Sequence, residues 1–393
     1  MVAAVATVAA AGLALYDLGT KSIWYDEAFT IGTVDRPIGD ALWRISHWEL
    51  NQSPFYVLTM VWHRLGDSEA FLRLPAGAFT VATVPLLFVL GRRMLDAWTG
   101  ALAAVVFAGH GLVVQWSQQV RGYSLATFLV VLATLLLLRA VERPTSTARV
   151  VLYAVVAAVA AYAHLLNVLV IAAHAMWLLL QRPVPVRLLR LGGAVLAVLG
   201  APLAVHVLTR NGDPLYWVGG PSGPGLVNEL SDVAGGGLRH AVVLGVLAVV
   251  GALAVGRRTL LPVLWLAVPI VAVVVSTYTV KPLLVSRFLI MVVPALALLV
   301  AAGVRRLPPI GAGVAVVALL AVSITGVRDG DDAGDHEGWR DAVAWFDAGR
   351  QPGDDVVTQP PTAAFAVRYY DPGAAIIPRA DIGAAGDRLW LFE

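Results

Sequence analysis

The sequence predicts an all-α polytopic membrane protein that ends in a small polar segment. Of its 393 residues, 59% are hydrophobic and 14% are charged, whereas soluble domains are about 45–50% apolar and about 25% charged. The mean hydropathy is +0.77. The apolar runs are about 16–22 residues long, which suits helices that cross a hydrocarbon core of about 30 Å. These observations exclude a water-soluble globule, and the run length also excludes an outer-membrane barrel.

The hydropathy pattern predicts about eleven transmembrane helices when the boundaries between them are set at clusters of charged residues or of Pro and Gly. They are expected at residues 2–18, 70–91, 98–115, 122–140, 149–164, 165–181, 190–208, 240–256, 259–278, 284–303 and 309–326. The first segment could instead be a cleaved signal peptide, but it has no Lys or Arg before its apolar run, which favours an uncleaved span. Residues 54–66 are apolar but too short to cross, so we expect a helix that lies at the outer interface.

Arginine distribution predicts the orientation. The short loops on one side hold Arg92, Arg93, Arg139, Arg143, Arg149, Arg182, Arg187, Arg190, Arg257, Arg258, Arg305 and Arg306. Only Asp96 and Glu142 oppose them there. The positive-inside rule therefore assigns this side to the cytoplasm, which places the long loops 19–69 and 209–239 outside the cell.

The last 67 residues, 327–393, form a separate polar unit in this interpretation. Residues 1–326 carry 22 Lys and Arg against 13 Asp and Glu, whereas residues 327–393 carry 6 against 13. Trp339, Ala342, Val343 and Phe346 recur with helical spacing, which predicts an amphipathic helix that begins near His336. DDVVTQPP and the terminal RLWLFE resemble strands. We therefore expect a small extracytoplasmic α/β segment that follows a membrane domain of residues 1–326. Because the sequence stops in a strand-like run, this segment could be incomplete.

Two neighbouring acids are the strongest candidates for chemistry. Asp26 and Glu27 follow the first span in WYDEAFT, where aromatic residues indicate the membrane interface. A partly desolvated carboxylate is a good base for a hydroxyl proton. The alternative is a juxtamembrane charge pair that reaches into water.

The outer face also collects cations, although the positive-inside loops lie opposite. Arg73, Arg121, Lys281 and Arg287 all fall on this face. An Arg at a hydrocarbon boundary needs a partner, and its planar fork suits a phosphate. Taken alone, each arginine is better explained as an interfacial anchor or as the partner of a nearby acid, Asp26, Glu27, Asp67 or Glu69. Together they favour a lipid phosphate as the ligand.

Several motifs, taken in order, resemble the membrane glycosyltransferases of the GT-C fold. The motifs are SIWYDEAFT, SEAFLRLP with GRR a helix later, QQVRGYSL, SRFLIMVVPALALL and HEGWRDAVAWFDAGRQPGDDVV. The chain is most similar to the branch of protein O-mannosyltransferases and aminoarabinose transferases. The resemblance covers nearly the whole chain.

This resemblance implies inverting transfer of mannose or another hexose from a polyprenyl-phosphate donor, on the extracytoplasmic side, to a hydroxyl of a protein, lipid or glycan acceptor. Asp26 would be the general base, and Glu27 would orient it or hold the acceptor. The resemblance implies a phosphate-binding role for Arg73, Arg121 and Arg287, and Lys281 is a further candidate. Tyr56, Tyr123 and His164 would line the substrate site. We expect membrane lipids as partners, and no metal, cofactor or nucleic acid.

The chain departs from the family pattern at two positions. Asn51, Gln52, Ser53 and Pro54 replace a His-Pro-Pro or Asn-Pro-Pro segment, and Gln119 replaces the acid of a QEAR motif. The first change argues against an acceptor or donor contact from that segment, and the neutral Gln119 weakens a metal-assisted mechanism. Two alternatives remain: a transporter or flippase, and a non-catalytic protein that binds lipid-linked sugars. The span interiors carry few ionisable residues, which disfavours transport.

Overall fold

The computed structural model describes residues 1–210, 212, 215, 217–220, 222–332, 337–378 and 388–392. The first half of the membrane part contains α1 (Val2–Leu15), α2 (Tyr25–Val34), α3 (Ile38–His47), α4 (Ser53–Trp62), η1 (His63–Leu65), α5 (Glu69–Met94), α6 (Ala97–Ala108), α7 (Gly111–Ser117), α8 (Tyr123–Glu142) and α9 (Thr147–Ala163). The second half contains α10 (Asn167–Leu179), α11 (Val186–Thr209), α12 (Gly223–Val233), α13 (Leu238–Val255), η2 (Gly256–Thr259), α14 (Leu260–Thr279), η3 (Ser286–Val292), α15 (Val293–Val304) and α16 (Pro309–Asp332). The C-terminal elements are α17 (Trp339–Gly349), β1 (Asp355–Thr358), η4 (Pro361–Ala363), α18 (Ala364–Tyr370) and β2 (Leu389–Phe392).

The helices account for the predicted spans in three groups. Six are long and apolar enough to cross a membrane: α5, α8, α11, α14 with η2, η3 with α15, and α16. Two further candidates are bent pairs, α6 with α7 and α12 with α13. Three shorter apolar helices, α1, α9 and α10, occupy the remaining predicted stretches. The multi-pass helical fold is confirmed, and the crossing of eleven spans stays a prediction.

The span predicted at 98–115 corresponds to two helices, α6 and α7, with a break at Gly109 and His110. The axes of α6 and α7 differ by 59°, and those of α12 and α13 by 65°. The two breaks meet: a Cβ on Gly111 would lie 2.5 Å from the carbonyl oxygen of Gly235, and Gly235 has a φ of +96°. Only glycine permits both the close approach and this backbone conformation.

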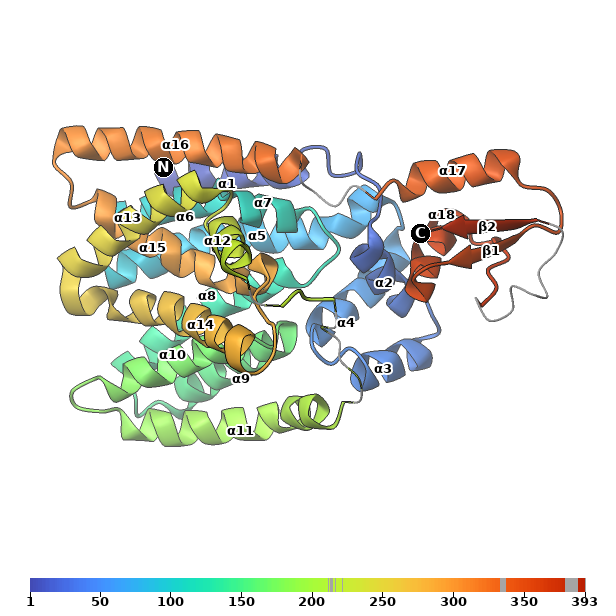
Figure 1. Cartoon of the computed structure of the whole chain (residues 1–393). Coiled ribbons are helices and arrows are strands. Elements are labelled where there is room, and N and C mark those ends of the chain that lie inside the picture. The colour runs from blue at the N-terminus through green and yellow to red at the C-terminus, as the bar shows by residue number, and fades with distance from the viewer. Residues whose placement is uncertain are drawn as a thin grey trace.

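The centre of the bundle is α15, all of whose residues from Val293 to Val304 are buried. It packs against α6, α13 and α14. At opposite edges lie α16 and α11, of which only 17% and 11% of the apolar window is buried (Figure 1). Their outward faces are apolar, as expected for helices that contact lipid. The bundle therefore has a packed core and a lipid-facing perimeter.

The predicted interfacial segment is helical, since α4 and η1 cover most of residues 54–66. It lies with α2 and α3 at one end of the bundle, next to the C-terminal segment (Figure 1). The amphipathic tail helix is also confirmed, as α17 buries Trp339, Val343 and Phe346. The expected start near His336 lies outside the described residues.

Both strand predictions for the tail are confirmed over the described residues. β1 and β2 pair in parallel, with Asp355 opposite Leu389 and Thr358 opposite Phe392. The tail helix packs its aromatic side chains on this ribbon, since Phe346 contacts Trp390 and Phe392. The helix α16 continues to Asp332, past the predicted boundary at residue 326.

A substitution in α13 tests the central packing. A Cβ on Gly251 would lie 2.0 Å from the carbonyl oxygen of Leu299 in α15, whereas one on Gly245 would meet nothing within 4 Å. We expect Gly251→Ala to lower the free energy of unfolding by about 1–3 kcal/mol, because the two backbones must separate. Gly245→Ala, in the same helix, should leave it unchanged or slightly higher. Thermal unfolding in detergent measures both; equal effects would contradict the close packing.

Candidate active site

The site begins at the N-terminus of α2, which is tied to the bundle by a buried carboxylate. Glu27 is the third residue of α2 and is fully buried. Its oxygens accept from Arg73 Nε at 2.8 Å, from Arg73 Nη2 at 2.6 Å, and from the backbone N–H of Val120 at 2.7 Å. An unpaired buried carboxylate would be strongly unfavourable. This bidentate pair therefore joins α2, α5 and the α7–α8 connection.

The Arg73 guanidinium has no donor left for a ligand. Besides its two bonds to Glu27, Nη1 donates to the carbonyls of Leu18 and Lys21, and Nη2 donates to that of Ser22. The five bonds use all five N–H groups of an arginine side chain. In this geometry Arg73 holds the loop between α1 and α2.

Asp26, in contrast, is reachable. Its side chain is 24% exposed, and Arg121 Nη2 lies 3.9 Å from Oδ2. Arg121 Nη1 also donates to the backbone carbonyl of Asp26 at 3.3 Å and to Thr30 Oγ1 at 3.1 Å. Burial opposes the charge on Arg121, but Asp26 and other neighbours raise its pKa further, so it stays a cation. The two predicted residues thus form one acid–cation unit.

A second carboxyl, that of Glu49, lies near this unit. It was not predicted from the sequence as a site residue. Tyr56 donates to Glu49 Oε2 at 3.4 Å, and Arg210 Nη2 lies 3.9 Å from Oε1. Burial raises the pKa of Glu49, although Arg121 and Arg210 lower it in part. Burial also raises the pKa of Tyr56. The sequence offered one signal: an acid two residues before the divergent segment that starts at Asn51.

Aromatic rings form a continuous wall beside Asp26. Ring centroids are separated by 6.1 Å from Trp24 to Trp116, by 4.6 Å from Trp116 to Tyr123, by 5.6 Å from Tyr123 to His164, and by 5.7 Å from His164 to Phe288. The wall therefore draws on α2, α7, α8, the end of α9, and η3. Two predicted substrate-binding residues, Tyr123 and His164, belong to it.

Arg287 lies among these rings. Its Cζ is 4.8 Å from the ring centroid of Trp217, 5.6 Å from Trp116, 5.8 Å from Phe288 and 6.0 Å from Trp24. These are cation–π distances, which stabilise a guanidinium at a site with little water. Arg121 contacts the same wall, with its Cζ 6.0 Å from the Tyr123 ring. Both predicted phosphate-binding arginines thus face one aromatic surface.

Several buried polar atoms of this region have no hydrogen-bond partner in the described structure. They are Trp24 Nε1, Trp116 Nε1, Gln119 Oε1, Arg121 Nε and Arg287 Nε. Buried polar groups are nearly always paired in native proteins. Four of these five atoms are donors, so the region suits a ligand rich in oxygen acceptors, such as a sugar or a phosphate.

The C-terminal segment holds the same loop from outside. Glu337 Oε2 accepts from the backbone N–H of Tyr25 at 2.8 Å, one residue before Asp26. Arg340 donates to the carbonyls of Gly19 and Thr20, and the Tyr370 hydroxyl accepts from the backbone N–H of Ile23 at 2.7 Å. The tail therefore helps to position the start of α2.

The remaining predicted residue, Lys281, lies half-buried between α14 and η3, in the same connection that leads to Arg287. Among the described residues, no three His, Asp or Glu side chains are grouped so that they could hold a metal ion.

Comparison with known proteins identifies the fold. Residues 53–207 match the family model described as dolichyl-phosphate-mannose-protein mannosyltransferase. ArnT from Cupriavidus metallidurans bound to undecaprenyl phosphate is 15% identical, with 95% of this chain and 85% of that chain covered and a TM-score of 0.65. The oligosaccharyltransferase AglB from Archaeoglobus fulgidus, in complex with an inhibitory peptide and a dolichol-phosphate, is 13% identical. The match covers 96% of this chain and 63% of that chain, with a TM-score of 0.56. No curated protein matches the sequence.

The mycobacterial arabinofuranosyltransferase AftD is 17% identical, with 90% of this chain and 30% of that chain covered and a TM-score of 0.55. The chain therefore has the GT-C fold of membrane glycosyltransferases, as its motifs predicted.

Removing the buried acid tests the structural role of the ion pair. We expect Glu27→Ala to lower the free energy of unfolding by about 3–5 kcal/mol, because it leaves Arg73 charged and unpaired in the interior. Glu142→Ala is the matched control, since Glu142 pairs with Arg93 at an exposed position and should cost at most about 1 kcal/mol. Thermal unfolding compares the two. A similar small loss in both variants would rule out a structural clamp.

Proposed function

We propose that the chain transfers a sugar, mannose or another hexose, from a polyprenyl-phosphate donor to a hydroxyl of a protein, lipid or glycan acceptor. The observation that carries the proposal is the joining of an accessible acid, Asp26, to a wall of aromatic rings and unpartnered donors around Arg121 and Arg287. The names of the matched family and of ArnT, AglB and AftD support a glycosyl transfer that uses a lipid-linked donor.

Asp26 takes the part of the general base. Its carboxylate accepts the proton of the acceptor hydroxyl as the oxygen bonds to the anomeric carbon, and the lipid phosphate leaves from the opposite face with inversion. The partial exposure of Asp26 supports this role because an acceptor can reach it. Arg121, at 3.9 Å, holds the acid near its working position.

Arg287 binds the departing phosphate in this proposal. Charge grows on the leaving phosphate as the glycosidic bond breaks, and a fixed guanidinium stabilises that charge in the transition state. Its unpartnered Nε supplies a donor, and the surrounding rings supply flat surfaces against which a sugar can stack. Arg121 and Lys281 complete the cationic side of the site.

The buried pair of Glu27 and Arg73 positions the site without touching the substrate. All the N–H groups of Arg73 are used within the chain, and Glu27 is fully buried. This assignment replaces the sequence-based expectation of an acceptor contact and a phosphate contact. Glu49 and Tyr56, which lie near Arg121, orient the acceptor in this proposal, and Tyr123 and His164 line the donor side.

The active site faces the extracytoplasmic side in this proposal. The arginine-rich turns lie at the far end of α5, α13 and α15 from Asp26, and the positive-inside rule assigns that far end to the cytoplasm. A transporter or flippase remains the alternative from another class, and a non-catalytic binder of lipid-linked sugars is a second. Within the described part, the most buried spans, α8 and η3 with α15, carry charges only near their ends, which disfavours transport.

Substitution of Asp26 tests the catalytic proposal. We expect Asp26→Asn to reduce transfer of sugar from a polyprenyl-phosphate donor by about 10²–10⁴-fold, because the amide cannot accept the proton. Donor binding should change little. The control is Asp35→Asn, since Asp35 follows the same helix but is 72% exposed. Full activity of Asp26→Asn in purified protein would remove this residue from the role of base; no transfer by the wild-type protein from any such donor would favour the non-catalytic binder.

Substitution of Arg287 tests the phosphate site. We expect Arg287→Gln to weaken binding of the polyprenyl phosphate by about tenfold or more, because a charge-assisted contact contributes about 1.5–3 kcal/mol. Arg368→Gln, at an exposed position of α18, should bind as the wild type does. Binding to each purified variant in detergent can be measured by thermophoresis. If Arg287→Gln changes only the affinity for the acceptor, the donor-side assignment is wrong.

A further inference from the structure

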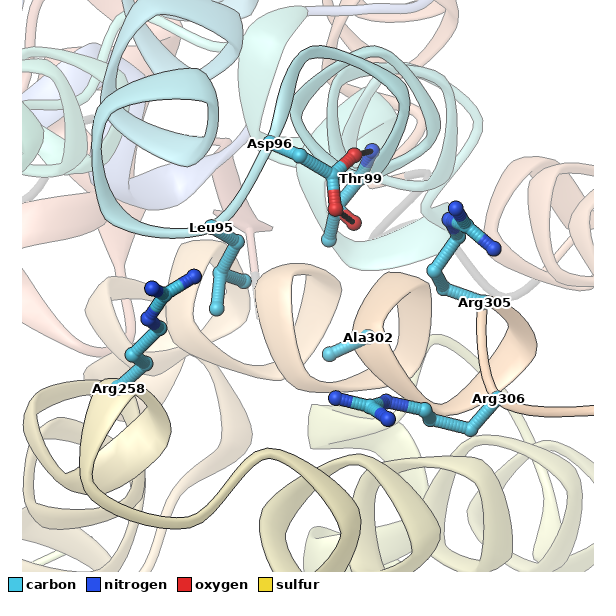
Figure 2. A pocket seen from close by; sticks show the side chains of 7 residues that line it. All are labelled: Leu95, Asp96, Thr99, Arg258, Ala302, Arg305 and Arg306. Atoms are coloured by element: carbon cyan, nitrogen blue, oxygen red, sulfur yellow. Dashed lines mark hydrogen bonds between the residues drawn. The ribbon is translucent and has the colours of Figure 1, made fainter.

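A polar cavity lies at the end of the bundle away from Asp26. Its volume is about 460 Å³, within the range of about 300–1,000 Å³ that is usual for small-molecule sites. The cavity is lined by Leu95, Asp96, Thr99, Arg258, Ala302, Arg305 and Arg306 (Figure 2). None of these residues belongs to the proposed active site.

Three separate turns build this cavity. They are the connection from α5 to α6, the turn η2 before α14, and the end of α15. The helix α5 separates it from the active-site end: it begins at Glu69, which contacts Arg340 of the tail, and ends at Met94, next to the cavity. Twenty-six helical residues span about 39 Å. The cavity therefore lies about one bilayer thickness from Asp26, at the other membrane surface.

None of the three arginines around this cavity forms an ion pair within 4 Å in the part of the chain that the structure describes. Neither Arg258 nor Arg306 makes a side-chain hydrogen bond there. Arg305 contacts the ring of Trp98, at 6.0 Å, and attracts the Asp96 carboxylate at longer range. Arg93, at the same end, differs from them because it pairs with Glu142. Like charges from three turns would repel one another across a shared space without an anion between them.

The single acid of the cavity, Asp96, offsets only one of these three positive charges, through Arg305, and it also caps a helix. Asp96 Oδ1 accepts from the backbone N–H of Thr99 at 2.9 Å, and Oδ2 accepts from the Thr99 hydroxyl at 2.9 Å. The lining thus carries three positive charges and one negative charge. Its chemistry favours an anion with several oxygen acceptors, for which guanidinium groups offer bidentate bonds.

We propose that this cavity binds a phosphate group, either that of an anionic lipid headgroup or free phosphate. The surroundings favour the lipid. Leu95 and Ala302 add apolar contacts, and Trp98 is 46% exposed beside Arg305, as an aromatic residue at a membrane interface would be. Basic pockets between transmembrane helices at the cytoplasmic surface suit such headgroups.

A pair of double variants tests the site in the full-length protein. Arg258→Gln with Arg306→Gln removes two lining cations, whereas Arg257→Gln with Arg143→Gln removes two arginines of the same surface that do not line the cavity. Each protein is placed in nanodiscs of phosphatidylcholine, with and without phosphatidylglycerol. Retention of phosphatidylglycerol is measured by native mass spectrometry, and stability by thermal unfolding. Inorganic phosphate is added to the phosphatidylcholine discs in a separate arm.

We expect the wild type and the control pair to retain phosphatidylglycerol and to unfold at higher temperature with it. The cavity pair should retain about 25-fold less, since each of its two arginines near an anionic surface contributes about 1 kcal/mol, a factor of about five. If inorganic phosphate stabilises the wild type but not the cavity pair, the bound phosphate group is free phosphate rather than a lipid headgroup. Equal losses in the two pairs would attribute the binding to general surface charge and overturn the proposal, as would no loss in either pair. Size-exclusion chromatography of each variant checks folding.

Discussion

The buried ion pair of Glu27 and Arg73 is the interaction on which the proposed active site depends. It joins three segments far apart in the sequence, since Glu27 also accepts from the backbone of Val120. Arg121 follows Val120 directly, and Asp26 precedes Glu27, so the pair brings acid and cation within 3.9 Å. A buried pair of this kind adds little net stability, but removing one partner is strongly unfavourable. Its geometry therefore defines the position of the reactive groups.

The tail adds a second restraint on the same loop. Glu337 binds the first backbone N–H of α2, and Tyr370 binds that of Ile23. The loop is thus held from the bundle by Arg73 and from the aqueous side by α17 and α18. The hydrogen bonds from Arg73 and from the tail fix the backbone around Asp26, while the Asp26 carboxylate itself stays exposed. Such an arrangement would hold a reactive group in place and leave it accessible to a substrate. The aromatic wall then supplies an apolar surface, where charge interactions are stronger than in water.

Much of the fold could be predicted because local patterns specify it. Apolar runs located the helices, the spacing of Trp339, Val343 and Phe346 located α17, and DDVVT located β1. The breaks between α6 and α7 and between α12 and α13 could not be predicted. They depend on the close approach of Gly111 to the carbonyl of Gly235, more than a hundred residues away, and hydropathy carries no information on such contacts.

The candidate site shows the same division. Sequence alone singled out Asp26, Arg121, Arg287, Tyr123 and His164, because a membrane chain tolerates few charges and polar groups without a reason. It counted both Asp26 and Glu27 as catalytic residues, and it gave Arg73 the same role as Arg287. Only the tertiary structure separated them. Glu27 and Arg73 pair with each other, whereas the Asp26 carboxylate is partly exposed and Arg287 Nε has no hydrogen-bond partner in the described structure. Residue type and spacing determined which groups carry charge; burial and hydrogen-bond partners, which arise from packing of distant segments, decided which of those charges are available to a ligand.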